Sequence, residues 1–224
     1  MKKISMLLVA LLAAASVSAV VITACSGGEM KKPDELGAVE ITEYQGEKLS
    51  SVNDFRENSI AGPQRVNIDS YTLQIGGLVN EPKSYTYNEV ISRNENYSKL
   101  VTLNCVEGWS VDIAWEGVLV KDLLEKSGIP PEATTVIFRA YDEYTTSLPL
   151  DFVLDNNIML AYKMNDITIP PERGFPFQLV AEDKWGYKWI KWVTAIELND
   201  VGFVGYWESR GYSEDGSLDE SFFR

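Results

Sequence analysis

Residues 102–110 read TLNCVEGWS and place Cys105 between a run that favours a β-strand and Trp109. The only other cysteine of the sequence, Cys25, ends an apolar N-terminal segment. If Cys25 is used in processing, Cys105 is an unpaired thiol. A lone cysteine is most often a small buried apolar side chain, because free cysteine is among the most buried residue types. The alternative is a thiolate with a chemical role, and the surrounding segments bear on that choice.

The composition describes a folded, acidic domain that has no histidine. Of 224 residues, 45% are hydrophobic and 11% aromatic, which indicates a single domain with a sizeable core behind a leader. The net charge of −13, without a basic stripe, argues against a nucleic-acid ligand. The absence of histidine excludes Ser-His-Asp and Cys-His catalysis, histidine-ligated zinc and covalent attachment of c-type haem.

The N-terminal segment has the layout of an export signal. Residues 1–24 combine Lys2 and Lys3 with a long apolar run and small residues, and residues 22–25 (ITAC) match a bacterial lipobox. We therefore expect a lipoprotein signal peptide over 1–24 and acylation of Cys25. The alternative is an uncleaved membrane anchor. Either way the protein is expected outside the cytoplasm, tethered to the membrane, with 25–50 as a tether and the start of the fold.

The body, residues 51–224, has the pattern of a sheet-rich α+β domain. Alternating or β-branched runs predict strands at 71–79, 99–106, 110–118, 134–142, 158–164, 176–182 and 188–198. Short helices are expected at 85–93 and 118–128, where Gly128 stands at the position of a C-terminal cap. No G-x-G-x-x-G or P-loop sequence occurs, so dinucleotide and nucleoside triphosphate binding lack their usual signal.

An ordered series of segments resembles the sulfite oxidase family, including the molybdopterin-binding domain of periplasmic methionine-sulfoxide reductases. The segments are NCVEGWS (104–110), DEYTTSLPL (142–150), YKMND (162–166), PPERGFPFQLV (170–180) and KWGYKWIKWVTAIEL (184–198). The resemblance covers most of residues 52–213. It implies a single, mixed, sheet-rich α+β domain of the sulfite oxidase type that binds molybdenum-molybdopterin, with tungsten as an alternative metal.

The resemblance gives Cys105 a chemical role. Molybdenum in this family is held by the two dithiolene sulfurs of one pterin and by a single cysteine of the protein. One unpaired thiolate is therefore the expected number, and soft sulfur ligands suit a metal that changes oxidation state while an oxygen atom is transferred. By resemblance, Cys105 is the metal ligand and a catalytic residue.

Further residues are assigned by the same resemblance. In DFRENSI (54–60), Arg56 would bind an oxyanion and Asn58 the pterin. Tyr212 would be an active-site tyrosine that donates a hydrogen bond near the metal. The residues expected to bind the pterin and its phosphate are Arg173, Lys188, Trp189, Ile190 and Lys191. The alternatives are an ordinary surface loop at 54–60, a solvated strand edge for the two lysines, and a tail aromatic packed on the core for Tyr212.

The sequence departs from the family pattern in three places. Gln178 stands where the family usually has arginine, no histidine is available near the cofactor phosphate, and the leader has Lys2 and Lys3 in place of a twin-arginine signal. These departures bear on cofactor loading. No cytochrome segment is recognised, so electrons are expected to pass through a separate carrier, either membrane-associated or a cytochrome.

The sequence therefore predicts an oxidoreductase that transfers an oxygen atom on a small sulfur compound or oxyanion. The competing hypothesis is a non-catalytic lipoprotein that retains the fold as a binding or scaffold module. Arginine and lysine side chains around Cys105, placed for a pterin phosphate, would favour the enzyme.

Overall fold

The computed structural model describes residues 39–224. The strands are β1 (Glu43–Tyr44), β2 (Glu47–Lys48), β3 (Thr72–Gly77), β4 (Lys83–Thr86), β5 (Tyr97–Asn104), β6 (Ser110–Leu119), β7 (Thr135–Ala140), β8 (Thr145–Pro149), β9 (Met159–Met164), β10 (Ile167–Thr168), β11 (Gln178–Val180) and β12 (Val193–Asn199). The helices are α1 (Tyr87–Ser92), α2 (Val120–Ser127) and α3 (Leu150–Asp155), and short 3₁₀ helices lie at η2 (Pro171–Arg173), η3 (Gly186–Lys188) and η4 (Glu208–Arg210).

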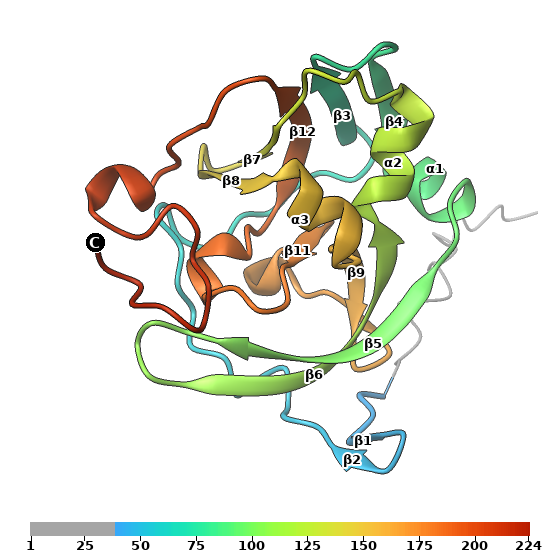
Figure 1. Ribbon diagram of the computed structural model, residues 1–224. Coiled ribbons are helices and arrows are strands. Elements are labelled where there is room, and N and C mark those ends of the chain that lie inside the picture. The colour runs from blue at the N-terminus through green and yellow to red at the C-terminus, as the bar shows by residue number, and fades with distance from the viewer. Residues whose placement is uncertain (1–38) are drawn as a thin grey trace, which may run out of the picture.

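The first large sheet has the order β10-β9-β6-β5, and β11 also pairs with β9. Its longest feature is the antiparallel hairpin of β5 and β6, drawn as a long curved ribbon in Figure 1. Between these strands the Cys105 amide donates to the carbonyl of Trp109 at 2.9 Å, and the Gly108 amide donates to the carbonyl of Cys105 at 3.0 Å. Gly108 has φ of +80°, which glycine adopts without strain. Cys105 therefore lies in the turn, just after the strand predicted to contain it.

The second large sheet has the order β4-β3-β12-β7-β8. Its central strand, β12, is parallel to β3 and antiparallel to β7. Buried side chains of both large sheets belong to one core, which includes Trp115, Phe138 and Phe177, all fully buried. The predicted sheet-rich α+β class and a single core are therefore confirmed.

The strand predicted at 188–198 is confirmed only from Val193, and its predicted start is wrong. Residues 186–188 form η3, and β12 starts only at Val193. Two features interrupt the extended backbone: the Lys188 side chain is fully buried in an ion pair, and Trp192 has φ of +53°. The segment before β12 is therefore a compact turn rather than a strand edge.

The N-terminal part of the described chain is attached to the body. The Glu40 carboxylate accepts hydrogen bonds from the Val52 amide at 2.6 Å and from Asn165 Nδ2 at 2.8 Å, and the Ser50 amide donates to the carbonyl of Asp112. Residues 39–50 thus begin the fold. The predicted signal peptide, Cys25 and the rest of the tether lie outside the described residues. In residues 39–224, none of the helices has the length and hydropathy needed to cross a membrane.

Candidate active site

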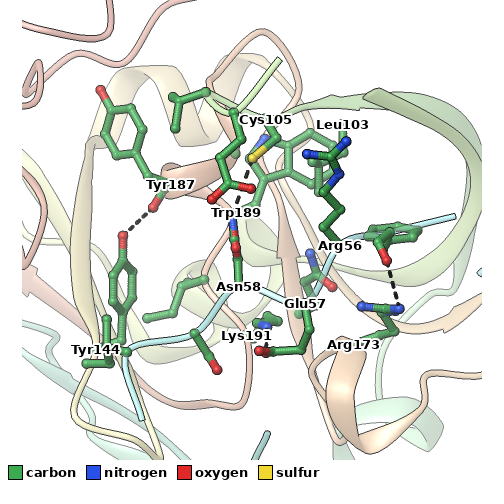
Figure 2. Close-up of a pocket in the computed structure, with 18 of the residues that line it drawn as sticks. Arg56, Glu57, Asn58, Leu103, Cys105, Tyr144, Arg173, Tyr187, Trp189 and Lys191 are labelled. Atoms are coloured by element: carbon green, nitrogen blue, oxygen red, sulfur yellow. Dashed lines mark hydrogen bonds and ion pairs between the residues drawn. The ribbon is translucent and has the colours of Figure 1, made fainter. Parts of the chain in front are cut away.

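A cavity of about 430 Å³ is bounded by segments that are distant in the sequence. They include the hairpin turn with Cys105, the loop 55–60, the segment 186–192 and the C-terminal residues Trp207 and Tyr212, and further lining residues come from 142–144 and 172–178. Figure 2 shows Cys105, Asn58 and Lys191 directed into this space. The structure therefore brings together residues that separate sequence motifs predict for one site.

Cys105 is 7% exposed and lines the cavity. Asn58 Nδ2 donates a hydrogen bond to Cys105 Sγ at 3.5 Å, as Figure 2 shows. Burial raises the pKa of the Cys105 thiol, and hydrogen bonds from the Glu107 backbone and the Asn58 side chain act in the opposite direction without offsetting burial. The ligand-free protein therefore holds a protonated thiol at neutral pH, and a metal that binds it displaces the proton.

Because burial raises the pKa of Cys105, we expect alkylation of this thiol by iodoacetamide to be slow at neutral pH. The rate should still be rising above roughly pH 8.5, where a free cysteine titrates, because the thiolate is the nucleophile. The measurement is mass spectrometry of the peptide that contains Cys105 in cofactor-free protein, over a pH series. The same peptide in urea is the control. A rate that is already constant at pH 8 would contradict the raised pKa.

The loop that carries Arg56 and Asn58 is fixed by Phe55. The Phe55 ring packs edge-on against Trp109 at 5.9 Å between ring centroids and against Trp115 at 6.4 Å. Such aromatic pairs are typically worth about 0.5–1.5 kcal/mol beyond the area they bury. The backbone on either side of Phe55 is therefore held, and Asn58 reaches Cys105.

Two arginines line the cavity and differ in what they contact. The Arg173 guanidinium donates to the backbone carbonyls of Val52 at 3.0 Å and Phe55 at 3.1 Å, and lies over the Phe55 ring. Arg56 is exposed and has no hydrogen-bond or ion-pair partner in the part of the chain described. Arg173 thus supports the loop with part of its donor set, whereas the whole Arg56 guanidinium is available to a ligand.

Lys191 lines the cavity together with Trp189 and Ile190. Its Nζ pairs with Glu57 at 3.0 Å and lies over the Trp192 ring at 4.5 Å from the centroid. Burial lowers the pKa of the Lys191 ammonium, and the hydrogen bond to Glu57 opposes that shift. A cation in this position suits a phosphate.

Lys188 is placed differently from the other predicted residues. Its side chain is fully buried outside the cavity lining, where Nζ pairs with Glu208 at 2.6 Å and donates to the carbonyl of Ser147 at 3.0 Å. The expected direct contact of the Lys188 side chain with a cofactor does not fit this position. The strand-edge alternative does not fit either, because Lys188 ends η3 and is inaccessible to solvent.

The Tyr212 ring lines the cavity and contacts Tyr187 at 5.1 Å and Trp207 at 5.2 Å between centroids. Its hydroxyl makes no hydrogen bond with the described residues. Three other cavity residues, Tyr144, Tyr187 and Trp207, were not predicted from the sequence. Tyr144 lies in the quoted segment 142–150, and its hydroxyl donates to the carbonyl of Tyr187 at 2.6 Å (Figure 2). These aromatic side chains were missed because nothing in their spacing separates cavity lining from core.

The family model described as an oxidoreductase molybdopterin binding domain matches residues 60–207. The chain belongs to this family. The predicted membership of the molybdopterin-binding sulfite oxidase and methionine-sulfoxide reductase group is thereby confirmed, and so is the predicted molybdopterin cofactor.

Three known proteins define how close the similarity is. The chain is 35% identical over 155 residues to the uncharacterized oxidoreductase YuiH of Bacillus subtilis, covering 69% of this chain and 78% of that protein. It is 29% identical over 147 residues to the protein-methionine-sulfoxide reductase catalytic subunit MsrP of Gluconobacter oxydans, covering 58% and 47%. The sulfane dehydrogenase SoxCD of Paracoccus pantotrophus has a similar fold, with a TM-score of 0.59 at 24% identity over 62% of this chain and 41% of that one.

The side chains that line the cavity of this molybdopterin-binding domain fit the cofactor. Gln178 lines the cavity, and its Oε1 is buried without a hydrogen-bond donor in the described chain. An unpaired buried acceptor is costly, and the N–H groups of a pterin would satisfy it. Gln178 replaces the arginine usual in the family, so it offers a neutral acceptor at that position. The Cys105 thiol suits the metal, the Asn58 amide suits the pterin, and the Lys191 ammonium suits the phosphate.

Proposed function

We propose that this protein is an extracytoplasmic oxidoreductase, tethered to the membrane through a lipid on Cys25, that transfers an oxygen atom on a small sulfur compound or oxyanion. The observation that carries the proposal is the buried Cys105 thiol in a cavity that also presents Arg56, Arg173 and Lys191. These cations favour the enzyme over the non-catalytic alternative. The ITAC segment supports the tether.

The bound molybdenum-molybdopterin supplies two-electron redox chemistry, and the protein supplies ligands, orientation and exclusion of water. Cys105, as a thiolate, would hold the metal through its sulfur. Asn58 donates to its sulfur and so tunes the ligand. Lys191 and the remaining donors of Arg173 would hold the pterin and its phosphate.

The substrate side of the cavity is assigned to Arg56 and Tyr212. The uncommitted Arg56 guanidinium binds the polar sulfur–oxygen group of the substrate and orients it. The Tyr212 hydroxyl, which makes no hydrogen bond with the described residues, would donate one to an oxygen of the substrate. Trp109 and Trp207 line the cavity beside them and limit access of water. Electrons pass to or from a separate carrier.

The experiment that tests this function is elemental analysis by mass spectrometry of protein purified from its native host, with fluorescence detection of oxidised pterin. We expect about one molybdenum or tungsten per chain, since one thiolate binds one metal. Metal-free and pterin-free protein from a host with an active cofactor pathway would overturn the proposal and favour a binding or scaffold module.

Substitution Arg56→Gln tests the substrate side. We expect KM for methionine sulfoxide or sulfite to rise about 10- to 100-fold, because a hydrogen bond to a charged group contributes roughly 1.5–3 kcal/mol. Metal content should stay unchanged. The matched control is Arg65→Gln, an exposed arginine outside the cavity lining. Equal KM values for the two variants would remove Arg56 from the assigned role.

A further inference from the structure

A buried ion pair lies behind the wall of the cavity. Lys188 Nζ and Glu208 Oε1 are 2.6 Å apart, and both side chains are fully buried. The Thr146 hydroxyl donates to the same carboxylate oxygen at 2.6 Å, and Lys188 also donates to the carbonyl of Ser147. The pair therefore connects three parts of the chain: strand β8, η3 and η4.

The pair is poorly explained as a source of stability alone. Removing two charges from water costs several kcal/mol per ion, and a buried pair recovers this only when its other hydrogen-bonding groups are also satisfied. Here Lys188 uses two of its three donors, and Glu208 Oε2 is buried without a hydrogen-bond donor in the described chain. Apolar side chains of similar volume would cost less. What an ion pair adds is a defined geometry between the two segments.

Two glycines show how closely the pair is enclosed. A Cβ atom at Gly205 would lie 2.5 Å from the carbonyl oxygen of Thr145 and 2.6 Å from Glu208 Oε2. A Cβ atom at Gly216 would lie 2.8 Å from Lys188 Cγ. Side chains do not fit at these positions, so the backbone of the C-terminal segment lies directly against both members of the pair. The segment is therefore held in one register.

The position of Glu208 determines where two cavity residues lie. Trp207 precedes it directly, and the Tyr212 amide donates to the carbonyl of Trp207 at 3.2 Å. On the other side of the pair, Lys188 lies between Tyr187 and Trp189, which also line the cavity. A shift of η4 relative to η3 would therefore move the Trp207 and Tyr212 rings relative to Tyr187.

We propose that Lys188 and Glu208 are positioning residues that hold the wall formed by Trp207 and Tyr212 against the substrate side of the cavity. The effect on turnover rests on the function proposed above, whereas the effect on the docking of the segment does not. Lys188 on this reading acts through Glu208 and contacts no ligand.

The test is the double substitution Lys188→Met and Glu208→Leu, which removes both charges and keeps similar volumes. We expect the thermal midpoint to stay within about 4 °C of the wild type, because apolar replacement of a buried pair is often neutral. We expect cleavage by trypsin after the exposed Arg210, within η4, to become at least about tenfold faster through local opening. Cleavage after the exposed Arg65 is the internal control and should not change.

Two further measurements separate positioning from other roles. Pterin and metal content of the double variant should equal that of the wild type, and kcat/KM should fall about tenfold or more. Unchanged cleavage at Arg210 would overturn the proposal, as would loss of pterin from a stable double variant, which would make Lys188 a cofactor contact. If the wild type also carries no metal or pterin, accelerated cleavage in the double variant would leave the positioning role in place and reject the proposed function instead.

If the double variant does not fold, Thr146→Val replaces it. Valine keeps the β-branched shape and deletes one hydrogen bond to Glu208, so accelerated cleavage at Arg210 is again the expected result. Cleavage at the wild-type rate in this variant would count against the proposal.

Discussion

Substitution Cys105→Ser is expected to abolish turnover, a loss of more than about 1000-fold, with the fold retained. Serine has nearly the same volume as cysteine, but its oxygen is a hard donor that stays protonated and does not replace a soft thiolate on this metal. Enzymatic rate enhancements exceed about 10⁶, so loss of the protein ligand to the metal removes most of the catalysis. Turnover with methionine sulfoxide and a reduced viologen dye is the measurement, together with molybdenum per chain.

The matched control for this substitution is Ser110→Ala. Ser110 lies in the same hairpin, opposite Asn104, and is exposed outside the cavity lining. It should keep wild-type turnover, which separates the role of the thiol from a disturbance of the hairpin. A Cys105→Ser protein that turns over as fast as the wild type would return Cys105 to the role of a packed apolar residue.

Substitution Trp115→Ala is expected to lower the free energy of unfolding by about 3–5 kcal/mol. Trp115 is fully buried, its Nε1 donates to the carbonyl of Val101 at 3.3 Å, and its ring contacts Phe55 and Trp189. Removing the indole leaves a large void between the two segments that bound the cavity on either side. Because both contacts are lost together, the cofactor should also dissociate more readily from this variant.

Equilibrium unfolding in urea measures the first effect, and pterin released on gel filtration measures the second. The control is Trp185→Ala, a tryptophan that is only partly buried and packs against Phe222. Trp185→Ala should lower the free energy of unfolding by clearly less than Trp115→Ala does. Equal losses for the two variants would show that Trp115 has no special place between the cavity walls.

The lone thiol and seven strands were predictable because their signals are local. The sequence patterns missed the shorter strands β1, β2, β4, β8 and β10. In β3 and the first half of β6, apolar and polar side chains alternate and burial follows that alternation, whereas β9 is a short apolar run that is buried almost throughout. Helix α1 has a complete capping box, in which the Thr86 hydroxyl accepts from the Glu89 amide and the Glu89 carboxylate accepts from the Thr86 amide.

The parts that sequence reasoning missed depend on contacts between distant residues. The segment 188–192 has the hydrophobicity of a strand, yet its path depends on Glu208, which lies further along the chain. Likewise, the different roles of Arg56 and Arg173 follow from the backbone carbonyls near Phe55, which Arg173 binds and Arg56 does not. Neither contact can be recognised from the spacing of residues or from the composition of the sequence.

The parallel pairing of β12 with β3 has a consequence for how the protein folds. Gln74 near the start of the domain pairs with Ala195 near its end, so closing this contact requires a loop that contains most of the domain. Contacts between residues far apart in the sequence slow folding, because the entropy of loop closure is lost before the pairing is formed. The central strand of the second sheet thus becomes available only after every residue between β3 and β12 has been synthesised. Since the segment 186–192 leads directly into β12, a binding-competent cavity forms only once β12 has joined β3.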